Sequence, residues 1–300
     1  MTTIAYANWW DDHQNPYFTK FIENNIGPVK EVNYTENPDI FFVSLFGSLS
    51  HQDILNTNAK CKIFYYGENL DRYSAYNDKI YREIFDLIVG FKYTDLSKKQ
   101  IRFPLWLLYY PYYSYNKNDN ILTYIQSQYN KNIKKNKDIF ASIVASHDKW
   151  GQREKIWDEL SKYGNIKSPG SYNKNTDSIG KSSKDKIDYT SRGIYNICPE
   201  NSSYEGYFTE KIFQAFEAGT IPLYWAIDFP EIEIINKNKY CFCDINDKEL
   251  LKKSVYHAVL NPKQYIQGDL FTKDAGQKIE LFYSTLLKNI LSIMCNNMIK

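Results

Sequence analysis

The sequence has few of the residues that build disulfide frameworks and metal centres. Of its 300 residues only five are Cys and four are His, and the His show no metal-ligand spacing. An odd number of scattered Cys argues against disulfides and a structural zinc, and favours a reducing compartment. Cys241 and Cys243 stand one residue apart in a predicted strand and are expected to point to opposite faces of it.

The sequence also lacks long apolar runs and an excess of charge. No stretch of 18 apolar residues occurs, so no transmembrane helix is expected. The first residues, "MTTIAYANWWDD", show no basic segment before an apolar core, so no signal peptide is expected either. With 37 Lys and Arg against 35 Asp and Glu, the charge is too balanced for a protein whose main partner is nucleic acid. We expect a cytoplasmic protein.

Apolar and aromatic residues are abundant. They make up 43% and 17% of the chain, and 27 residues are Tyr. This composition and length predict one large or two medium domains with sizeable cores. Tyr combines apolar area with a polar tip, which suits cores near a surface and clefts that stack sugars or bases.

Short apolar segments alternate with polar, helical ones, which predicts α/β architecture with parallel sheets of Rossmann type. The predicted strands are 3–7, 39–46, 61–66, 86–91, 139–145, 193–198, 221–226 and 239–244. The predicted helices are 16–26, 151–164, 209–218 and others beyond 246. The segment 103–115 is interrupted by Pro104 and Pro111 and is expected to be irregular, and 164–184 is expected to be a polar loop.

The polar stretch 130–138 separates two halves of this pattern. We therefore predict two Rossmann-like domains, 1–137 and 138–275, facing each other across a cleft, with a C-terminal helix in 276–300 packed on them. Ligands of open parallel sheets bind beyond the carboxyl ends of the strands, and a cleft between domains is a preferred site for small molecules. The last helix is amphipathic, which leaves peripheral contact with the inner face of a membrane open as a second interpretation.

One predicted helix start carries an unusual charge. Thr209 is the expected N-cap and Glu210 suits a first turn, but Lys211 opposes the helix dipole. A bound anion would explain it, because free backbone N–H groups and a Lys form a phosphate cradle; a solvent-facing Lys is the alternative. Gly206 lets the preceding loop pass close to a ligand. Arg153 lies at the equivalent strand-to-helix junction of the preceding helix.

The candidate functional residues of the first half lie just after predicted strands. Glu68 comes just after a buried strand, where a carboxylate can act as a general base, or can instead support a turn with Asn69. Trp9 and Trp10 also follow a strand. They are candidates for a sugar-binding rim or for packing between domains, and Asn69 is a further candidate residue of the acceptor cleft.

These residues point to a family. The block "CPENSSYEGYFTEKIFQAFEAGTIPLYW" (198–225) closely resembles the signature of the α1,3/α1,4-fucosyltransferases, glycosyltransferase family 10. The segments "IAYANWW", "FYYGEN" and "RFPLWLLYY" resemble its bacterial members, in the same order. Two features depart from the family: Ala226 replaces a usual Gly, and the heptad repeats and basic tail of some bacterial relatives are absent.

The resemblance implies a GT-B fold that binds GDP-fucose in the C-terminal domain and the acceptor in the N-terminal one. It implies an inverting single displacement, with Glu68 as the general base. Arg153 and Lys211 match the cations that hold the diphosphate and stabilise the leaving GDP. Asn201, Tyr207 and Glu210 match residues around the nucleotide and sugar.

The implied product is an α1,3 linkage to a GlcNAc- or glucose-type residue of an acceptor of the N-acetyllactosamine type. No obligatory metal or other cofactor is expected, since GT-B enzymes generally need none and the chain shows no paired-Asp motif. Two alternatives stay open. One is a GT-B enzyme that uses another GDP-sugar or forms an α1,4 linkage, and the other is a non-catalytic protein that binds glycans or nucleotides.

Overall fold

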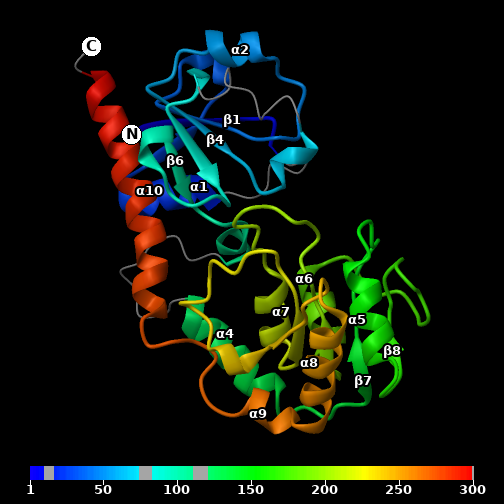
Figure 1. Ribbon diagram of the computed structural model, residues 1–300. Coiled ribbons are helices and arrows are strands. Elements are labelled where there is room, and N and C mark those ends of the chain that lie inside the picture. The colour runs from blue at the N-terminus through cyan, green and yellow to red at the C-terminus, as the bar shows by residue number, and fades with distance from the viewer. Residues whose placement is uncertain (10–16, 74–82, 111–120, 299–300) are drawn as a thin grey trace. The chain divides into compact units, whose positions relative to one another are not determined.

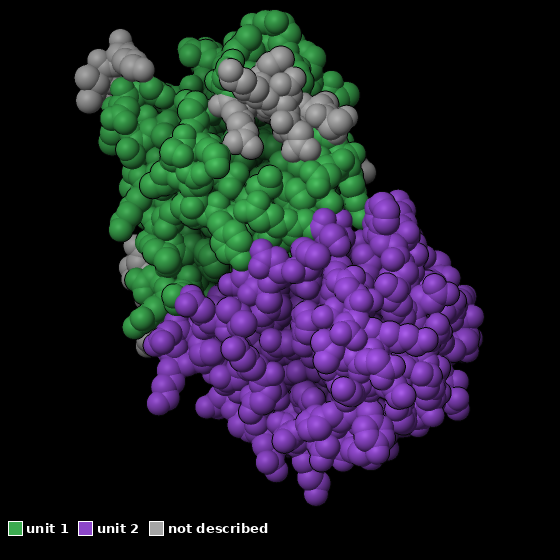
Figure 2. All heavy atoms as spheres, viewed as in Figure 1, with its two compact units in different colours: residues 1–118, 204–207, 277–300 green, residues 119–203, 208–276 purple. Residues whose placement is uncertain are grey.

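A computed structural model describes residues 1–9, 17–73, 83–110 and 121–298 (Figure 1). The chain divides into two compact units, which Figure 2 shows in two colours. Unit 1 comprises residues 1–118, 204–207 and 277–300, and unit 2 comprises 119–203 and 208–276. The predicted boundaries between domains stay a prediction. Trp10 lies outside the described residues.

Unit 1 is built on a six-stranded sheet in the order β2-β1-β3-β4-β5-β6, in which every neighbouring pair is parallel. The strands at 40–43 and 87–90 are continuously buried, as expected for a sheet covered on both faces. The strands are β1 (Thr2–Ala7), β2 (Val29–Glu31), β3 (Ile40–Val43), β4 (Cys61–Tyr65), β5 (Leu87–Gly90) and β6 (Gln100–Arg102). The α-helices are α1 (Tyr17–Asn25), α2 (His51–Asn56) and, from residue 277 on, α10 (Ala275–Met298).

Helix α10 packs on α1 within unit 1. The Tyr17 hydroxyl donates a 2.9 Å hydrogen bond to the Tyr283 hydroxyl, and the rings of Phe21 and Tyr283 stack at 5.9 Å. The same face of α10 buries Ile279, Leu286 and Ile290. In the described part of the chain, no helix is both long enough and apolar enough to cross a membrane.

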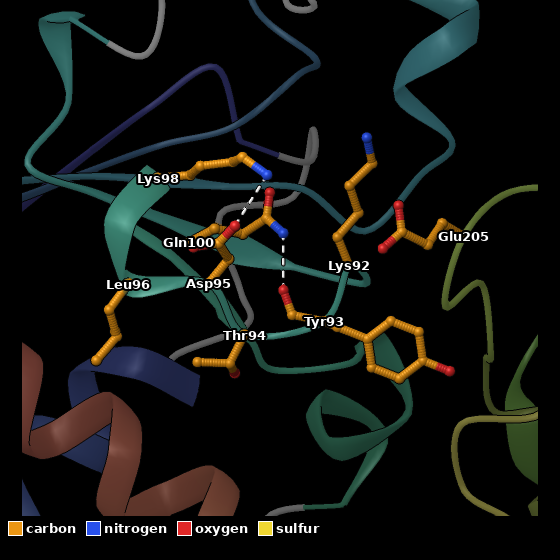
Figure 3. Close-up of a pocket in the computed structure, with 8 residues that line it drawn as sticks. All are labelled: Lys92, Tyr93, Thr94, Asp95, Leu96, Lys98, Gln100 and Glu205. Carbon is orange, nitrogen blue, oxygen red and sulfur yellow. Dashed lines mark hydrogen bonds and ion pairs between the residues drawn. The ribbon is translucent and has the colours of Figure 1, made fainter.

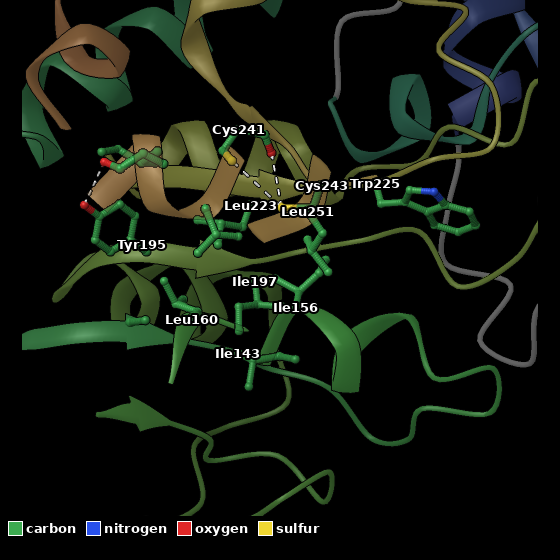
Figure 4. Close-up of a cluster of buried hydrophobic side chains, with 14 of the residues drawn as sticks. Ile143, Ile156, Leu160, Tyr195, Ile197, Leu223, Trp225, Cys241, Cys243 and Leu251 are labelled. Carbon is green, nitrogen blue, oxygen red and sulfur yellow. Dashed lines mark hydrogen bonds between the residues drawn. The ribbon is translucent and has the colours of Figure 1, made fainter. Parts of the chain in front are cut away.

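Unit 2 is built on a five-stranded parallel sheet in the order β11-β10-β9-β7-β8. Aliphatic side chains of β7, β9 and β10 pack with α5 and α8 into one core (Figure 4). The strands are β7 (Ile139–Ser142), β8 (Ile166–Lys167), β9 (Gly193–Ile197), β10 (Ile221–Tyr224) and β11 (Cys241–Phe242). The helices are α4 (Ile121–Asn132), α5 (Gln152–Leu160), α6 (Ser183–Thr190), α7 (Lys211–Glu217), α8 (Lys248–Leu260) and α9 (Pro262–Ile266).

Two parallel sheets with helices confirm the predicted α/β class, while several local expectations need correction. Helix α4 runs into the stretch interpreted as a polar separator, and the expected loop 164–184 contains β8 and the first residues of α6. Cys241 and Cys243 were expected on opposite faces of their strand, which is wrong. Both are buried with their Sγ atoms 3.9 Å apart, because alternate residues of a strand point to the same face.

Candidate functional site

Unit 2 holds a buried cluster of charges between β9 and α7. Beyond β9 the chain continues beside β10, where the Cys198 N–H donates to the Leu223 carbonyl and the Glu200 N–H donates to that of Trp225. This pairing places the Glu200 carboxylate inside the unit with no exposed side-chain area. It accepts hydrogen bonds from the Thr209 N–H (2.8 Å), the Thr209 hydroxyl (2.7 Å) and the Tyr224 hydroxyl (2.9 Å). Glu200 was not predicted as a functional residue.

The Lys211 ammonium binds to this cluster. Its Nζ donates to the Thr209 hydroxyl at 2.8 Å and lies 3.2 Å from Glu200 Oε2 and 3.7 Å from Glu210 Oε1. Only 13% of the Lys211 side chain is exposed, so the solvent-facing alternative does not describe this residue. Thr209 was expected to be the N-cap of α7, which is wrong. Helix α7 starts at Lys211 with Glu210 as N-cap, and the Thr209 hydroxyl bonds to Glu200 instead.

A second Lys, on α6, adds positive charge to this cluster. Burial alone would raise the pKa of the Glu210 carboxyl, but the charges of Lys211 and Lys186 hold that pKa below its usual value. Burial lowers the pKa of the Lys186 ammonium, against the opposite influence of Glu210. The carboxylates of Glu200 and Glu210 thus lie beside the Lys211 ammonium and within the electrostatic influence of Lys186, in a largely buried place where charges interact strongly. Lys186 was missed: it lies just beyond the expected loop 164–184, in helix α6, which was not predicted.

Arg153 and Asn201 come together in the same unit. The Arg153 guanidinium is buried at the start of α5 and donates hydrogen bonds to the Asn201 side-chain oxygen and to the His147 carbonyl. Asn201 follows Glu200 in the chain, so the segment 200–201 contacts both predicted cations, Arg153 and Lys211. Two fixed cations of this kind suit an anionic ligand such as a diphosphate.

In unit 1, Glu68 lies three residues beyond the end of β4. Its carboxylate accepts a 3.3 Å hydrogen bond from the Tyr207 hydroxyl and lies 3.8 Å from the Arg72 guanidinium. The Glu68 side chain is 31% exposed, so it is held in place and still open to a substrate. Asn69 is buried, and its side-chain oxygen accepts a hydrogen bond from the Asp71 N–H.

Tyr207 belongs to the segment 204–207, which is part of unit 1 and is held there by Phe91 and Arg102. The Tyr207 ring is buried against Phe91, with 4.7 Å between ring centroids. Arg102 donates a 2.9 Å hydrogen bond to the Gly206 carbonyl. Gly206 has φ = 68°, and a Cβ there would lie 2.3 Å from the Phe91 carbonyl oxygen, so this close approach requires glycine.

Trp9 is placed mainly by packing. It is 5% exposed, and its ring contacts those of Tyr6, Phe18 and Tyr65 at centroid distances of 5.1, 5.9 and 5.7 Å. It also lines a pocket together with Asn8. Among the residues that the structure describes, no group of three or more His, Cys, Asp or Glu side chains could hold a metal ion.

Comparison with known proteins places this architecture in a class. Two crystal structures of α1,3-fucosyltransferase, the second with GDP-fucose, superpose with TM-scores of 0.67 and 0.64 at 24% and 23% sequence identity. They cover 96% and 95% of this chain and 90% of theirs. The fold is that of a GT-B glycosyltransferase, as the resemblance implied.

The sequence comparisons are more specific. The model of the α-(1,3)-fucosyltransferase FucT N-terminal domain matches residues 4–109, and that of the glycosyltransferase family 10 (fucosyltransferase) C-terminal part matches 133–267. The chain belongs to glycosyltransferase family 10. It is 27% identical to the α-(1,3)-fucosyltransferase FucT of Helicobacter pylori over 95% of its own length, and it spans 66% of the length of that relative.

Proposed function

We propose that this protein transfers L-fucose from GDP-fucose, with inversion, to a hydroxyl of a GlcNAc- or glucose-type residue in a glycan, forming an α1,3 linkage. The observation that carries the proposal is the pair of fixed cations beside the segment 200–201 of unit 2, Arg153 on Asn201 and Lys211 on Glu200. The names of the relatives support the choice of donor and linkage.

The residues around the two cations have separate roles in binding the donor. In this proposal Arg153 and Lys211 hold the diphosphate and stabilise the negative charge that develops on the leaving GDP, which fixed charges in a desolvated site do well. Glu200 and Thr209 hold the Lys211 ammonium in place before the donor arrives. Asn201, Glu210 and Tyr207 contact the nucleotide and the fucose.

Glu68 is the proposed general base. It takes the proton of the acceptor hydroxyl as that oxygen attacks the anomeric carbon, and the bond from this carbon to the GDP oxygen breaks on the opposite face. A base needs to be fixed and accessible to the hydroxyl that it deprotonates. The hydrogen bond from Tyr207 and the partial exposure of Glu68 support this role.

We further propose a cytoplasmic location and a reaction without an obligatory metal. The experiment measures GDP release from GDP-fucose with N-acetyllactosamine and related acceptors, with and without EDTA. Formation of an α1,3-fucosylated product that is insensitive to EDTA is expected. Absence of GDP release with every acceptor would reject the activity, and strong inhibition by EDTA would reject the metal-free reaction.

A further inference from the structure

A pocket of about 420 Å³ opens in unit 1 beyond the carboxyl ends of β1 and β3. It combines the end of β1, the loop after β3 and parts of the segments around Tyr34 and Asp53. Its ten lining residues include Asn8, Tyr34, Phe46, Ser48 and Asp53. Its volume is in the range of small-molecule sites, and the roles proposed above for Glu68, Arg153 and Lys211 do not use it.

The strand order places this pocket at a special point of the sheet. From β1 the chain moves to the edge strand β2 and then returns to β3 on the other side of β1. The connections on the two sides of this point run in opposite directions, which opens a crevice between them. Ligands of open parallel sheets bind in this crevice, beyond the carboxyl ends of the strands.

The pocket wall is held in a strained conformation. Asn8 is buried and has φ = 51°, which is uncommon for a residue other than glycine. It fixes the loop 46–49 with three hydrogen bonds: its carbonyl accepts from the Phe46 N–H (2.8 Å), and its side chain accepts from the Leu49 N–H (2.8 Å) and donates to the Leu49 carbonyl (3.1 Å). A Cβ on Gly47 would lie 2.3 Å from Asn8 Oδ1. Strain that the surrounding contacts maintain is frequent at binding sites.

The chemistry of the lining selects a neutral, polar ligand with an apolar face. Tyr34 and Phe46 are half-buried aromatic side chains, whereas Asn8, Ser48 and Asp53 supply amide, hydroxyl and carboxylate groups. The ten lining residues include one carboxylate and neither Lys nor Arg, so an anion would not be favoured. A sugar ring matches this combination, because its C–H groups pack on aromatic rings and its hydroxyls bond to polar groups.

A second pocket of unit 1 is lined by more charged side chains than the pocket beside β1. It has a volume of about 570 Å³ and lies around the connection from β5 to β6. Lys92, Lys98, Asp95 and Glu205 line it, and Figure 3 shows the ion pair between Lys98 and Asp95. Its many charges suit a neutral sugar less well, and this pocket provides a control.

The strand order places the pocket beside β1 two strands away from β4, after which Glu68 follows. Strands β1, β3 and β4 are consecutive neighbours, and two strand spacings amount to about 10 Å, a distance that a disaccharide spans. We infer that the pocket formed by Asn8, Tyr34, Phe46 and Ser48 binds a neutral sugar ring of the acceptor, next to the ring whose hydroxyl Glu68 deprotonates. This inference rests on the proposed function and names the part of the protein that recognises the acceptor beyond the reacting ring.

Two variants test the inference by different routes. Ser48→Trp fills the pocket from an exposed position, and Phe46→Ala removes an aromatic surface. Each is expected to raise the KM for N-acetyllactosamine about tenfold, because an aromatic contact of this size is lost or blocked. The KM for GDP-fucose and the KM for free N-acetylglucosamine should stay unchanged. Tyr93→Ala, which truncates an aromatic side chain in the second pocket, should change none of these values.

An unchanged KM for N-acetyllactosamine in both variants would overturn the inference, and so would an equal rise for the disaccharide and the monosaccharide. A rise with Tyr93→Ala alone would place the sugar in the second pocket instead. If the wild-type protein transfers fucose to no acceptor, the proposed function fails separately. Saturation-transfer NMR with N-acetyllactosamine then tests whether the pocket beside β1 binds this disaccharide. Loss of the signal in Ser48→Trp supports the pocket, and an undiminished signal in this variant overturns it.

Discussion

Glu68 is the residue whose chemistry is easiest to isolate. Its carboxylate is fixed by Tyr207 and Arg72, both of which belong to the same unit. A glutamine at this position would keep the shape of the side chain and could still accept a hydrogen bond from Tyr207, but it could not accept a proton. The substitution therefore separates proton transfer from positioning.

We expect Glu68→Gln to lower kcat by about 10²- to 10⁴-fold, the usual contribution of a general base. The Kd for GDP-fucose should not change, as calorimetric titration would show. Glu205→Gln is the matched control, because it makes the same change at an exposed Glu of unit 1 and should keep full activity. An active Glu68→Gln enzyme would remove Glu68 from the role of base.

Lys211 and Glu200 form a buried ion pair whose partners depend on one another. Lys211→Met would leave the fully buried Glu200 carboxylate without its nearest cation, which costs about 3–5 kcal/mol in the free energy of unfolding. Adding Glu200→Gln removes the uncompensated charge and should recover part of this loss. Urea denaturation measures both effects. Neither variant should recover donor binding, since both lack the Lys211 ammonium; equal stability of the single and double variants would contradict the coupling.

At the scale of elements, α10 depends on one apolar face. Ile279, Tyr283, Leu286 and Ile290 are buried at helical spacing, whereas Leu281 of the same helix is 59% exposed. Leu286→Ala should lower the free energy of unfolding by about 2–5 kcal/mol, because it opens a cavity in the core of unit 1. Leu281→Ala should change it by no more than about 0.5 kcal/mol. Equal effects of the two variants in thermal unfolding would show that this face does not anchor the helix.

The elements that sequence patterns predicted well are those with strong periodicity. The strands β3, β4, β5, β9 and β10 lie within predicted segments, and β1 begins one residue before its predicted start, because apolar runs between polar segments are typical of parallel sheets. The short helices α2 and α6 were not predicted. They are largely polar, and Ile54 and Thr190 are their only buried residues, so their sequences carry little periodic signal. Helix α4 was also not predicted, although its sequence does carry a periodic signal: Ile121, Ile125 and Tyr129 recur every four residues.

The candidate site shows a similar division between local and long-range information. Lys211 stood out because a cation at a helix start opposes the dipole, which is a local signal. Its partner Glu200 lies eleven positions earlier, and Tyr224, which donates a hydrogen bond to Glu200, lies thirteen positions after Lys211. Lys186 reaches the same cluster from another helix. Such contacts are made by the packing of β9, β10 and α7, which no spacing in the sequence reveals.

At the scale of the whole molecule, donor binding and stability are linked. A ligand that binds the folded state alone stabilises it by about 2.7 kcal/mol when its concentration is 100 times its Kd. We therefore expect GDP to raise the Tm of the protein in a concentration-dependent way, and equally with EDTA present if no metal is required. The Lys211→Met variant should lose this shift, because the proposed diphosphate site lacks a cation.

The same measurement separates the two ligand sites that we propose. Ser48→Trp alters only the pocket beside β1, so GDP should raise its Tm as much as it raises that of the wild-type protein. N-acetyllactosamine should stabilise the wild-type protein and the Lys211→Met variant alike, but not Ser48→Trp. If GDP no longer stabilised Ser48→Trp, the pocket beside β1 would contribute to donor binding. The assignment of the donor to the cluster around Lys211 and of the acceptor to the pocket beside β1 would then be wrong.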